Sequence, residues 1–337
     1  MISIDSAAGK RRIEKAVVAG AGIMGHGIAQ LLATKGIHVR LVDRTDDLLI
    51  RARGFIEENF SFMAELGEME QTEISGILER IVFTTDLVGN LHETDYVVEA
   101  VTENFQIKRA VWDTLGKHAG AHTILASNTS SYDIDDLAAG IPNPGRVIGT
   151  HWFHPPQITP CVEVIPSRKA DPANIDLIMG FLTGIGKVPT LCKSAPGFVA
   201  NRIQMALAAE ALALVEEGLA TPSEVDRIVK TSFGFRLSAY GPFEIIDQAG
   251  ADTYLSVYRY LFEKLKKPHF KPPRLLIEQV ESERLGLKTE AGFYDYGQGA
   301  AEALRRERDR KFYARLKVHR KERKCRNSNV EIRDKFK

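Results

Sequence analysis

Residues 15–43, KAVVAGAGIMGHGIAQLLATKGIHVRLVD, contain the pattern that decides the fold of this chain of 337 residues. A short apolar run at 16–19 has the length and character of a buried parallel strand. Three glycines in GxGxxG spacing follow it, and apolar residues then recur at helical spacing before a second apolar run at 37–42. This order of strand, glycine turn, helix and strand predicts the first βαβ unit of a doubly wound α/β sheet.

The residues of the glycine turn each have a physical role in holding a dinucleotide. Gly20 allows a sharp turn, Gly22 lets the backbone approach a pyrophosphate, and Gly25 lets the helix pack close to the sheet. The helix that begins at Ile23 and Met24 offers free N–H groups and the positive end of its dipole to the phosphates. The turn therefore predicts a dinucleotide-binding site.

An acidic residue ends the second strand of this unit. Asp43 lies about 20 residues beyond the glycines, where a carboxylate can accept hydrogen bonds from both ribose hydroxyls and repel a 2′-phosphate. Arg44, directly after it, is the one residue that weakens this preference. The expected cofactor is NAD rather than NADP.

Composition excludes several classes of protein. The 45 basic and 44 acidic residues leave a formal net charge of +1, which gives no global reason to expect a nucleic acid or an anionic membrane as partner. The three cysteines, Cys161, Cys192 and Cys325, lack CxxC spacing, which argues against a disulfide framework or structural zinc. No apolar run is long enough to span a bilayer, and the N-terminus lacks the apolar segment of a secretory signal. We expect a cytoplasmic protein without a membrane partner.

Strand and helix patterns alternate through the first part of the chain. Residues 46–80 carry two helical patterns broken near Gly67, which we interpret as a helical pair inserted after the second strand. Further patterns predict strands at 81–84, 96–101, 123–127 and 146–150, and a helix near 106–118. This alternation implies a parallel sheet with right-handed crossovers. We therefore predict an N-terminal, NAD-binding Rossmann-type doubly wound parallel sheet in residues 1–193.

The pattern changes at 194–197, where SAPG has the polar-then-proline order of a helix start. Residues 198–217 predict one long helix that is apolar on most faces and therefore buried, and TPSE at 221–224 resembles a capping box that starts another helix. So apolar a helix commonly packs in a bundle or a subunit interface. We predict a second, all-helical C-terminal domain at 194–325 for substrate binding and dimerisation, and hence a homodimer.

The end of the chain is strongly basic, with the run RRERDRKFYARLKVHRKERK at 305–324. Acidic residues are interleaved in it, and no aromatic stripe lies beside the basic residues to stack bases. We interpret the run as a solvated helix and residues 326–337 as a mobile basic tail, and we expect no nucleic-acid partner.

Polar side chains directly follow several predicted strands, where ligands collect in parallel sheets. They are Glu99, Glu103, the serine-rich cluster at 127–131 and His151. An imidazole titrates near neutral pH, so His151 beside a nicotinamide can take a proton as hydride leaves the same carbon. A carboxylate on the other ring nitrogen, for which Glu163 is the candidate, would fix the tautomer and stabilise the imidazolium.

The HxxH spacing of His151 and His154 also raises the hypothesis of a metal site. His154 precedes two prolines on an irregular loop, and no third ligand is obvious. We therefore predict no metal.

Six motifs in order resemble the L-3-hydroxyacyl-CoA dehydrogenase family, which includes the 3-hydroxybutyryl-CoA enzymes. They are GAGIMGHGIA, VVEAVTENFQIK, ASNTSS, GTHWFHPP with VEVIP, SAPGFVANRI and GLKTEAGFYDY, and the resemblance covers residues 14–296. It implies an NAD-binding domain, a mainly helical dimerisation domain, and reversible NAD-dependent oxidation of a 3-hydroxyl to a 3-ketone.

The resemblance also implies roles for individual residues. His151 matches the family's catalytic base and Glu163 its orienting acid. Ser130 and Asn201 match polar groups near the substrate oxygen and thioester. The positions around the cofactor and the mouth of the site are Glu103, Lys108 and Lys288.

Two departures from the family pattern bear on the substrate. The first is His154, which stands where the family has Asn. The second is that the inserted pair at 46–80 carries Arg51 and Arg53 early but no lysine, whereas the phosphates of coenzyme A bind to cationic side chains. The HxxxPP motif with VEV is also similar to L-gulonate and carnitine dehydrogenases and to lens lambda-crystallins. The substrate is therefore either an acyl-CoA or a small free 3-hydroxy acid. A crystallin-like NAD-binding structural protein is the third hypothesis, against which the intact pair of His151 and Glu163 argues.

Overall fold

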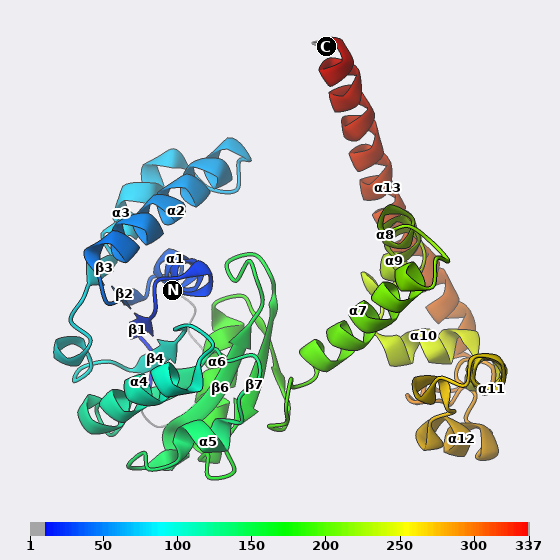
Figure 1. The fold of residues 1–337 in the computed structure, drawn as a ribbon, viewed down its shortest axis with the longest axis horizontal. Coiled ribbons are helices and arrows are strands. Elements are labelled where there is room, and N and C mark those ends of the chain that lie inside the picture. Colours follow the sequence, from blue (N-terminus) through cyan, green and yellow to red (C-terminus); the bar gives the residue numbers. More distant parts are fainter. Residues whose placement is uncertain (1–10, 336–337) are drawn as a thin grey trace. The chain divides into compact units, whose positions relative to one another are not determined.

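Figure 1 shows the protein as a computed structural model, which describes residues 11–335 and, beyond residue 321, the backbone alone. The chain forms two compact units, residues 1–208 and residues 209–337, so the division falls inside helix α7 (Ala200–Glu216). Each unit has a hydrophobic core of its own. The domain boundary between residues 193 and 194 stays a prediction.

The first unit is built on an eight-stranded sheet with the strand order β3-β2-β1-β4-β5-β6-β7-β8. In chain order the strands are β1 (Lys15–Ala19), β2 (His38–Val42), β3 (Ile81–Thr84), β4 (Tyr96–Glu99), β5 (Ile124–Ser127), β6 (Val147–Trp152), β7 (Cys161–Pro166) and β8 (Val188–Leu191). The order reverses between β1 and β4, and such a reversal is where doubly wound sheets bind ligands, at the carboxyl ends of the strands. The predicted Rossmann-type fold is confirmed.

One pair of strands corrects the prediction of a wholly parallel sheet. β6 and β7 run antiparallel, whereas every other neighbouring pair is parallel. The loop 153–160 joins β6 to β7 directly and is too short to hold the crossover that a parallel pair requires. β7 then pairs in parallel with β8, a strand absent from our prediction.

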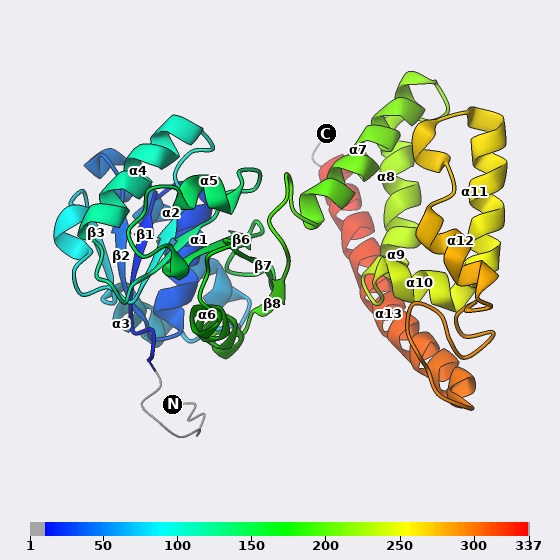
Figure 2. The same cartoon turned by 90° about the horizontal axis from the view of Figure 1, so that it is seen from below.

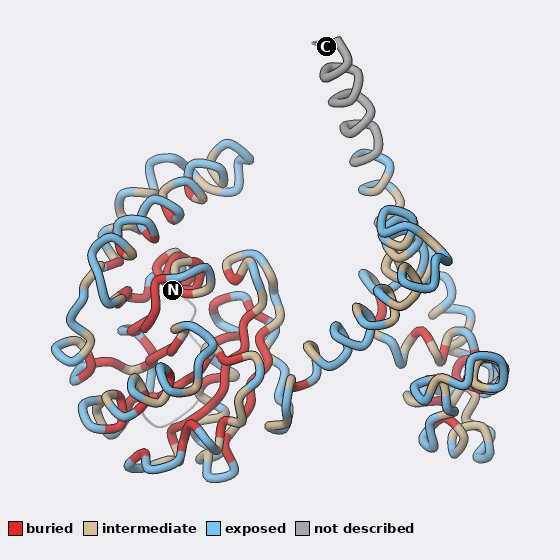
Figure 3. The backbone as a smooth tube through the Cα atoms, in the orientation of Figure 1, coloured by how far each residue is buried: buried red, intermediate tan, exposed pale blue. Residues whose placement is uncertain are grey.

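Helices cover both faces of the sheet. α1 (Ile23–Thr34), α2 (Asp46–Glu65) and α6 (Pro172–Gly184) pack in one buried cluster, and α4 (Phe105–His118) and α5 (Ile134–Ala138) pack in the other. Figure 2 shows α4 and α5 on the opposite side of the strands from α6. Figure 3 shows that buried residues gather in the strands, and every residue of β4 and β5 is buried. The sheet is therefore a rigid support for the side chains that follow its strands.

The inserted helical pair is present where the sequence predicts it. α2 ends before Gly67, which has a φ of +73°, and α3 (Ile74–Leu78) follows a short 3₁₀ turn at Gln71–Glu73. A positive φ favours glycine, so Gly67 marks the break between the two helices. Ile56 and Phe60 of α2 are fully buried in the core and fix the pair to the rest of the unit.

The second unit is helical, as predicted. Its helices after α7 are α8 (Pro222–Thr231), α9 (Phe233–Leu237), α10 (Pro242–Ala249), α11 (Ala251–Leu265), α12 (Arg274–Glu281) and α13 (Ala300–Lys335). Thr221 and Glu224 form the predicted capping box at the start of α8. On α13, Phe312 packs against Phe235 and Tyr240, which fixes the basic helix to α9 and to the segment between α9 and α10.

The expectation that the long apolar helix is buried is wrong for the isolated chain. No residue of α7 is buried, and Ile203, Met205 and Leu212 are each more than half exposed. Composition alone does not say whether an apolar helix packs within its own chain or against another molecule.

The C-terminal tail and the membrane-spanning potential of the helices are the remaining features that the sequence addresses. The predicted mobile tail at 326–337 lies outside the residues whose side chains are described, and its mobility stays a prediction. None of the helices in the described part of the chain is long and apolar enough to cross a membrane.

Candidate active site

The glycine turn between β1 and α1 shows why each glycine is needed. Gly20 has a φ of +107°, and a Cβ there would stand 2.6 Å from the carbonyl oxygen of Ala100. A Cβ on Gly25 would stand 1.7 Å from the carbonyl oxygen of Gly20. At Gly22, by contrast, a Cβ would meet no atom within 4 Å. Packing therefore explains Gly20 and Gly25, whereas Gly22 borders open space that a ligand can enter.

The start of α1 is suited to a phosphate. No side chain caps this helix, and its first turn contains no acidic residue. The N–H of His26 bonds back to the Gly22 carbonyl oxygen at 3.1 Å, so the amides of Ile23, Met24 and Gly25 have no partner within the helix. These free donors, the helix dipole and the open side of Gly22 together fit the pyrophosphate of a dinucleotide.

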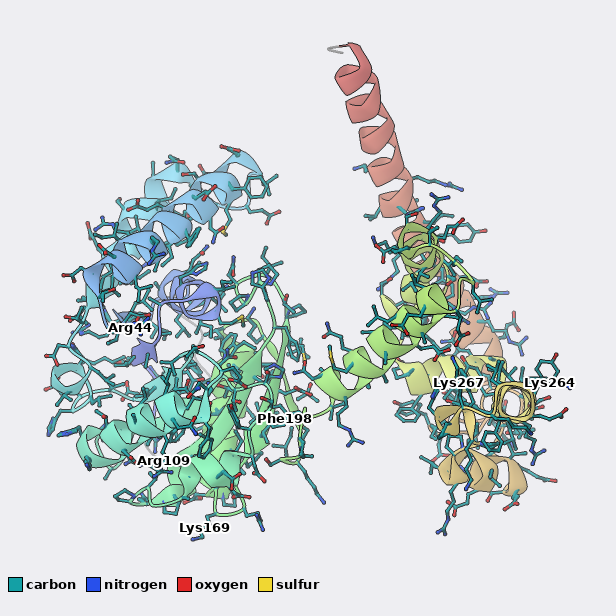
Figure 4. The ribbon with its side chains drawn as sticks, in the orientation of Figure 1. Arg44, Arg109, Lys169, Phe198, Lys264 and Lys267 are labelled. Carbon is teal, nitrogen blue, oxygen red and sulfur yellow. The ribbon has the colours of Figure 1, made fainter. Side chains whose placement is uncertain are left out.

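Asp43 is tied to the same turn. Its Oδ2 accepts a hydrogen bond from the Ala21 N–H at 2.7 Å, and its Oδ1 accepts one from the Arg44 N–H at 2.7 Å. The Arg44 side chain is exposed just after β2 (Figure 4). Two backbone amides therefore hold the Asp43 carboxylate beside the glycine turn, where the sequence predicts the ribose.

His151 and Glu163 form a buried pair on neighbouring strands. His151 Nδ1 lies 2.8 Å from Glu163 Oε2, and the two residues are 5% and 4% exposed. Glu163 Oε1 accepts hydrogen bonds from the N–H groups of Val199 at 3.1 Å and Ala200 at 2.9 Å, at the start of α7. These two bonds fix the position of the Glu163 carboxylate from the side opposite to His151's contact with Oε2, so that Oε1 is held by backbone and Oε2 by the imidazole. No hydrogen bond to His151 Nε2 is seen within the described residues.

Two aromatic rings border the His151 imidazole. The Phe153 ring centroid lies 4.5 Å away, and that of Phe198 lies 5.7 Å away. Phe198, labelled in Figure 4 just before α7, is itself buried. The two rings therefore contribute to the burial of the imidazole.

Glu103 joins the serine-rich cluster to Lys108. Its Oε1 accepts hydrogen bonds from Thr129 Oγ1 at 2.6 Å, the Ser130 N–H at 3.0 Å and Ser131 Oγ at 2.9 Å. Its Oε2 lies 3.0 Å from Lys108 Nζ. Burial raises the pKa of Glu103, but the Thr129 hydroxyl and the Lys108 charge outweigh that effect and lower its pKa to about 2. Glu103 is therefore ionised throughout the neutral range.

Ser130 and Asn201 lie in direct contact, and their predicted place beside the substrate stays a prediction. Asn201 Nδ2 donates to the Ser130 carbonyl oxygen at 3.1 Å. The Ser130 hydroxyl lies 3.4 Å from Glu103 Oε1, a long and weak contact. Both residues remain partly exposed, so their polar groups are accessible to a ligand.

Lys108 is not at the surface. Its side chain is 1% exposed, and Nζ lies 2.8 Å from Oε1 of Glu99, which is also fully buried. Glu99 Oε2 further accepts hydrogen bonds from Trp112 Nε1 at 3.2 Å and Ser127 Oγ at 2.8 Å. Lys108 is therefore a buried cation that holds the Glu103 carboxylate through an ion pair.

The remaining predicted residues lie elsewhere. Lys288 belongs to the second unit, where Nζ lies 2.8 Å from Asp252 Oδ1, and its predicted place at the cofactor stays a prediction. His154 is exposed on the loop 153–160. Burial and, to a smaller extent, nearby His154 lower the pKa of His26 on α1. In the part of the chain that the structure describes, no three His, Cys, Asp or Glu side chains are placed to hold a metal ion.

Comparison with known proteins decides the family. Residues 15–195 match the family model described as 3-hydroxyacyl-CoA dehydrogenase, NAD binding domain, and residues 197–296 match that of its C-terminal domain. The chain belongs to the 3-hydroxyacyl-CoA dehydrogenase family.

Individual members of the 3-hydroxyacyl-CoA dehydrogenase family align over most of their length. The mitochondrial hydroxyacyl-coenzyme A dehydrogenase of Homo sapiens is 36% identical over 301 residues, which cover 87% of this chain and 95% of that protein. A 5-formyl-3-hydroxy-2-methylpyridine 4-carboxylate 5-dehydrogenase of Mesorhizobium japonicum is 34% identical over 303 residues, 90% of this chain and 97% of the relative. The crystal structure of a 3-hydroxyacyl-CoA dehydrogenase from Archaeoglobus fulgidus superposes with a TM-score of 0.75 at 32% identity, covering 90% of this chain and 98% of that one.

Membership of the 3-hydroxyacyl-CoA dehydrogenase family makes the protein an NAD-dependent oxidoreductase that acts on a CH–OH group. The resemblance inferred from the six motifs and the expectation of NAD are both confirmed. The family does not fix the substrate, because relatives of similar identity have different ones.

Sequence reasoning missed some contributors to this candidate site. Phe153 and Phe198 border the imidazole, and Asn128 Oδ1 accepts a hydrogen bond from the Trp152 N–H at 2.9 Å, which joins the ends of β5 and β6. Asn128 belongs to the polar cluster at 127–131 that the sequence marks, but nothing in that pattern indicates its bond to Trp152. The phenylalanines gave no signal, because aromatic residues are common in any core.

Proposed function

We propose that the protein oxidises (S)-3-hydroxyacyl-CoA to 3-ketoacyl-CoA reversibly, and that it does so as a homodimer in the cytoplasm. The observation that carries the proposal is the buried pair of His151 and Glu163. His151 lies near the carboxyl end of β6, on the same edge of the sheet as the glycine turn after β1. A base for the substrate hydroxyl must lie beside the carbon that loses hydride, and the end of β6 is such a place.

His151 is the proposed general base. With its Nδ1–H donated to Glu163, the neutral imidazole presents Nε2 as the proton acceptor for the 3-hydroxyl group. When Nε2 takes the proton, the adjacent carboxylate stabilises the imidazolium that forms. Bound NAD⁺ supplies the carbon that accepts the hydride. In the reverse direction the imidazolium returns the proton to the ketone oxygen.

Ser130 and Asn201 are the proposed substrate-positioning pair. Their mutual hydrogen bond leaves the Ser130 hydroxyl and the Asn201 amide oxygen accessible for the reacting oxygen and the thioester carbonyl. Glu103 bonds to the Ser130 backbone and so holds the cluster in place. In this proposal Ser130 and Asn201 position the substrate, and His151 alone transfers the proton.

The cofactor is held by the glycine turn in this proposal. The amides of Ile23, Met24 and Gly25 face the pyrophosphate, and Gly20 and Gly22 allow the backbone to approach it. Asp43 binds the ribose hydroxyls. Glu103, held by the buried Lys108, is proposed to border the cofactor, and Lys288 is assigned to the mouth of the site by the family resemblance alone.

A kinetic assay of NADH formation and consumption tests the proposal. Acetoacetyl-CoA should be reduced by NADH, and His151→Gln should abolish turnover while the affinity for NADH stays within about threefold. His122→Gln, at an exposed histidine of the same unit, is the matched control and should keep wild-type turnover. Retained activity in His151→Gln would remove that residue from the base role.

A small free 3-hydroxy acid is the second candidate substrate. It is favoured by the exposed His154 in place of the family's Asn and by the lack of lysines in the inserted pair at 46–80. A relative named for a pyridine carboxylate shows that members of this family serve other substrates. Reduction of free acetoacetate but not of acetoacetyl-CoA in the same assay would select this candidate.

A further inference from the structure

Lys187 is a buried cation outside the site described so far. It lies between α6 and β8 and is 6% exposed. Its Nζ donates to the carbonyl oxygens of Pro156 at 2.6 Å and Thr159 at 2.8 Å. No carboxylate lies within ion-pair distance of Nζ in the described part of the chain; the nearby charge that acts on it is that of Lys35.

The environment of Lys187 is costly for a charge. Burial, with a smaller contribution from the Lys35 charge, lowers the pKa of Lys187 to about 8. The Trp152 ring lies beneath the ammonium, with its centroid 5.7 Å from Nζ, and offers a weak attraction. Buried cations are normally paired with an acid. Because Lys187 has no such partner among the described residues, the two carbonyl oxygens are the main contacts that hold its ammonium.

Both carbonyls belong to the loop 153–160, which follows the strand of the catalytic base. Phe153 in this loop borders His151, and His154 is the residue that departs from the family pattern. The far end of the loop is held by a hydrogen bond from the Val188 N–H to the Pro160 carbonyl oxygen at 2.8 Å. Lys187 therefore holds the middle of the loop, between its two ends.

Side chains of the loop also pack against the helix of the glycine turn. A Cβ on Gly27 of α1 would stand 2.6 Å from Gln157 Oε1 and 2.7 Å from Pro156 Cγ. The loop is thus held by contacts with α1 through its side chains and with the Lys187 ammonium through its carbonyls. A shift of the loop would move Phe153 and His154 relative to both the base and the cofactor helix.

We propose that Lys187 is a positioning residue of the dehydrogenase: its ammonium holds the Pro156 and Thr159 carbonyls and thereby keeps the loop 153–160 in the conformation that admits substrate beside His151. This role rests on the proposed function, since it acts through the loop on substrate binding. Lys187 itself touches neither the base nor the glycine turn.

The experiment compares Lys187→Met, which removes the charge at similar length, with Lys187→Arg, which keeps it. Lys187→Met should raise KM for acetoacetyl-CoA about tenfold or more, with NADH affinity within about threefold of wild type, because the loop and not the glycine turn is released. Lys187→Arg should recover most of the loss. Lys169→Met, at an exposed lysine labelled in Figure 4, is the control and should match wild type.

Limited proteolysis by chymotrypsin gives a readout that needs no substrate. Lys187→Met should be cleaved at Phe153 at least about fivefold faster than wild type, while Lys187→Arg and Lys169→Met should not. If Lys187→Met fails to fold, Lys187→Gln replaces it, because the amide still donates hydrogen bonds but carries no charge.

Two results would overturn the proposal: a variant that is less stable but keeps wild-type KM and cleavage rate, or an arginine variant no better than the methionine one. If wild type reduces no hydroxyacyl substrate, the proposed function fails instead, and the cleavage rates still decide the role of Lys187.

Discussion

His151 and Glu163 are direct partners in the single antiparallel pair of the sheet, with Nδ1 and Oε2 2.8 Å apart. Their side chains meet because β7 turns back beside β6, so that residues opposite each other face the same side of the sheet. Had β7 been reached by a crossover, Glu163 would stand in another register. The departure from parallel order is therefore what creates the proposed catalytic pair.

Glu163→Gln tests the orienting role. The amide oxygen can still accept from Val199 and Ala200, but the NH₂ group then faces Nδ1 and forces the proton onto Nε2, the wrong tautomer for a base. We expect kcat to fall by about 10²- to 10⁴-fold with NADH affinity unchanged. Glu58→Gln, at an exposed acid on α2, should have no effect. A kcat within threefold of wild type, about 0.7 kcal/mol in barrier, would contradict the role.

Much of this site could be predicted from the sequence because its signals are local. The glycine turn needs only the conformations of Gly20 and the close approach at Gly25, and both appear as glycines at fixed spacing. The strand-end positions of Glu103 and His151 follow from alternating strand and helix patterns, since parallel strands end at one edge. Family resemblance then singled out Ser130 within the polar cluster at 127–131 and added Asn201, which no local pattern marks.

The parts that escaped prediction depend on contacts far apart in the chain. The antiparallel turn at 153–160 cannot be told from a crossover by apolar periodicity alone. The hydrogen bonds from the Val199 and Ala200 N–H groups to Glu163 depend on where the chain begins α7. The burial of Lys108 and Lys187 runs against the general tendency of lysine to be exposed, so composition pointed the wrong way.

Two glycines of the same turn should respond differently to alanine. Gly22→Ala meets no atom within 4 Å, so the protein should keep its stability but bind NADH at least about tenfold more weakly, because the methyl group occupies pyrophosphate space. Gly25→Ala places a Cβ 1.7 Å from the Gly20 carbonyl oxygen and should lower both stability and NADH affinity. Thermal unfolding and NADH fluorescence titration measure the two effects. Equal NADH affinity in Gly22→Ala and wild type would rule out a pyrophosphate at this place.

Asp43→Ala should relax the preference between NAD and NADP. Loss of the carboxylate removes the repulsion of a 2′-phosphate, and the exposed cation Arg44 follows directly in the sequence. We expect the ratio of kcat/KM for NADH over NADPH to fall at least about tenfold, mainly through weaker use of NADH. Because Asp43 also accepts from the Ala21 N–H, a small loss of stability should accompany the change. The matched control is Asp46→Ala, at an exposed acid in the first turn of α2.

Glu103 should make stability depend on pH in the acid range. Its pKa is lowered from 4.5 to about 2 in the folded protein, so the unfolded chain binds the proton more readily. The contribution of Glu103 is therefore complete above pH 4.5 and is lost as the pH falls toward 2. In Glu103→Gln the free energy of unfolding should change less steeply over that window, as measured by urea unfolding at several pH values. The control is Glu68→Gln, at an exposed acid of the same unit, which should follow the wild-type curve. If Glu103→Gln also follows that curve, the contacts of Glu103 do not contribute to the pH dependence of stability.

Asp247 should dominate the stability of the second unit. Its side chain is fully buried, and the carboxylate accepts from the N–H groups of Phe293 and Tyr294, each at 3.0 Å, and from the Tyr296 hydroxyl at 2.8 Å. Asp247→Ala leaves these three donors without their acceptor and should cost about 3–5 kcal/mol of unfolding free energy. Asp226→Ala, at a mostly exposed ion pair, should change it by less than about 0.5 kcal/mol.

Chemical denaturation followed by circular dichroism measures the Asp247 effect on the helical unit. Three of the hydrogen bonds that hold the segment 286–296 end on this carboxylate, so Asp247→Ala should also make that segment more sensitive to proteolysis. A loss below about 1 kcal/mol would mean that the three donors find water instead, and that the segment is held by its other contacts.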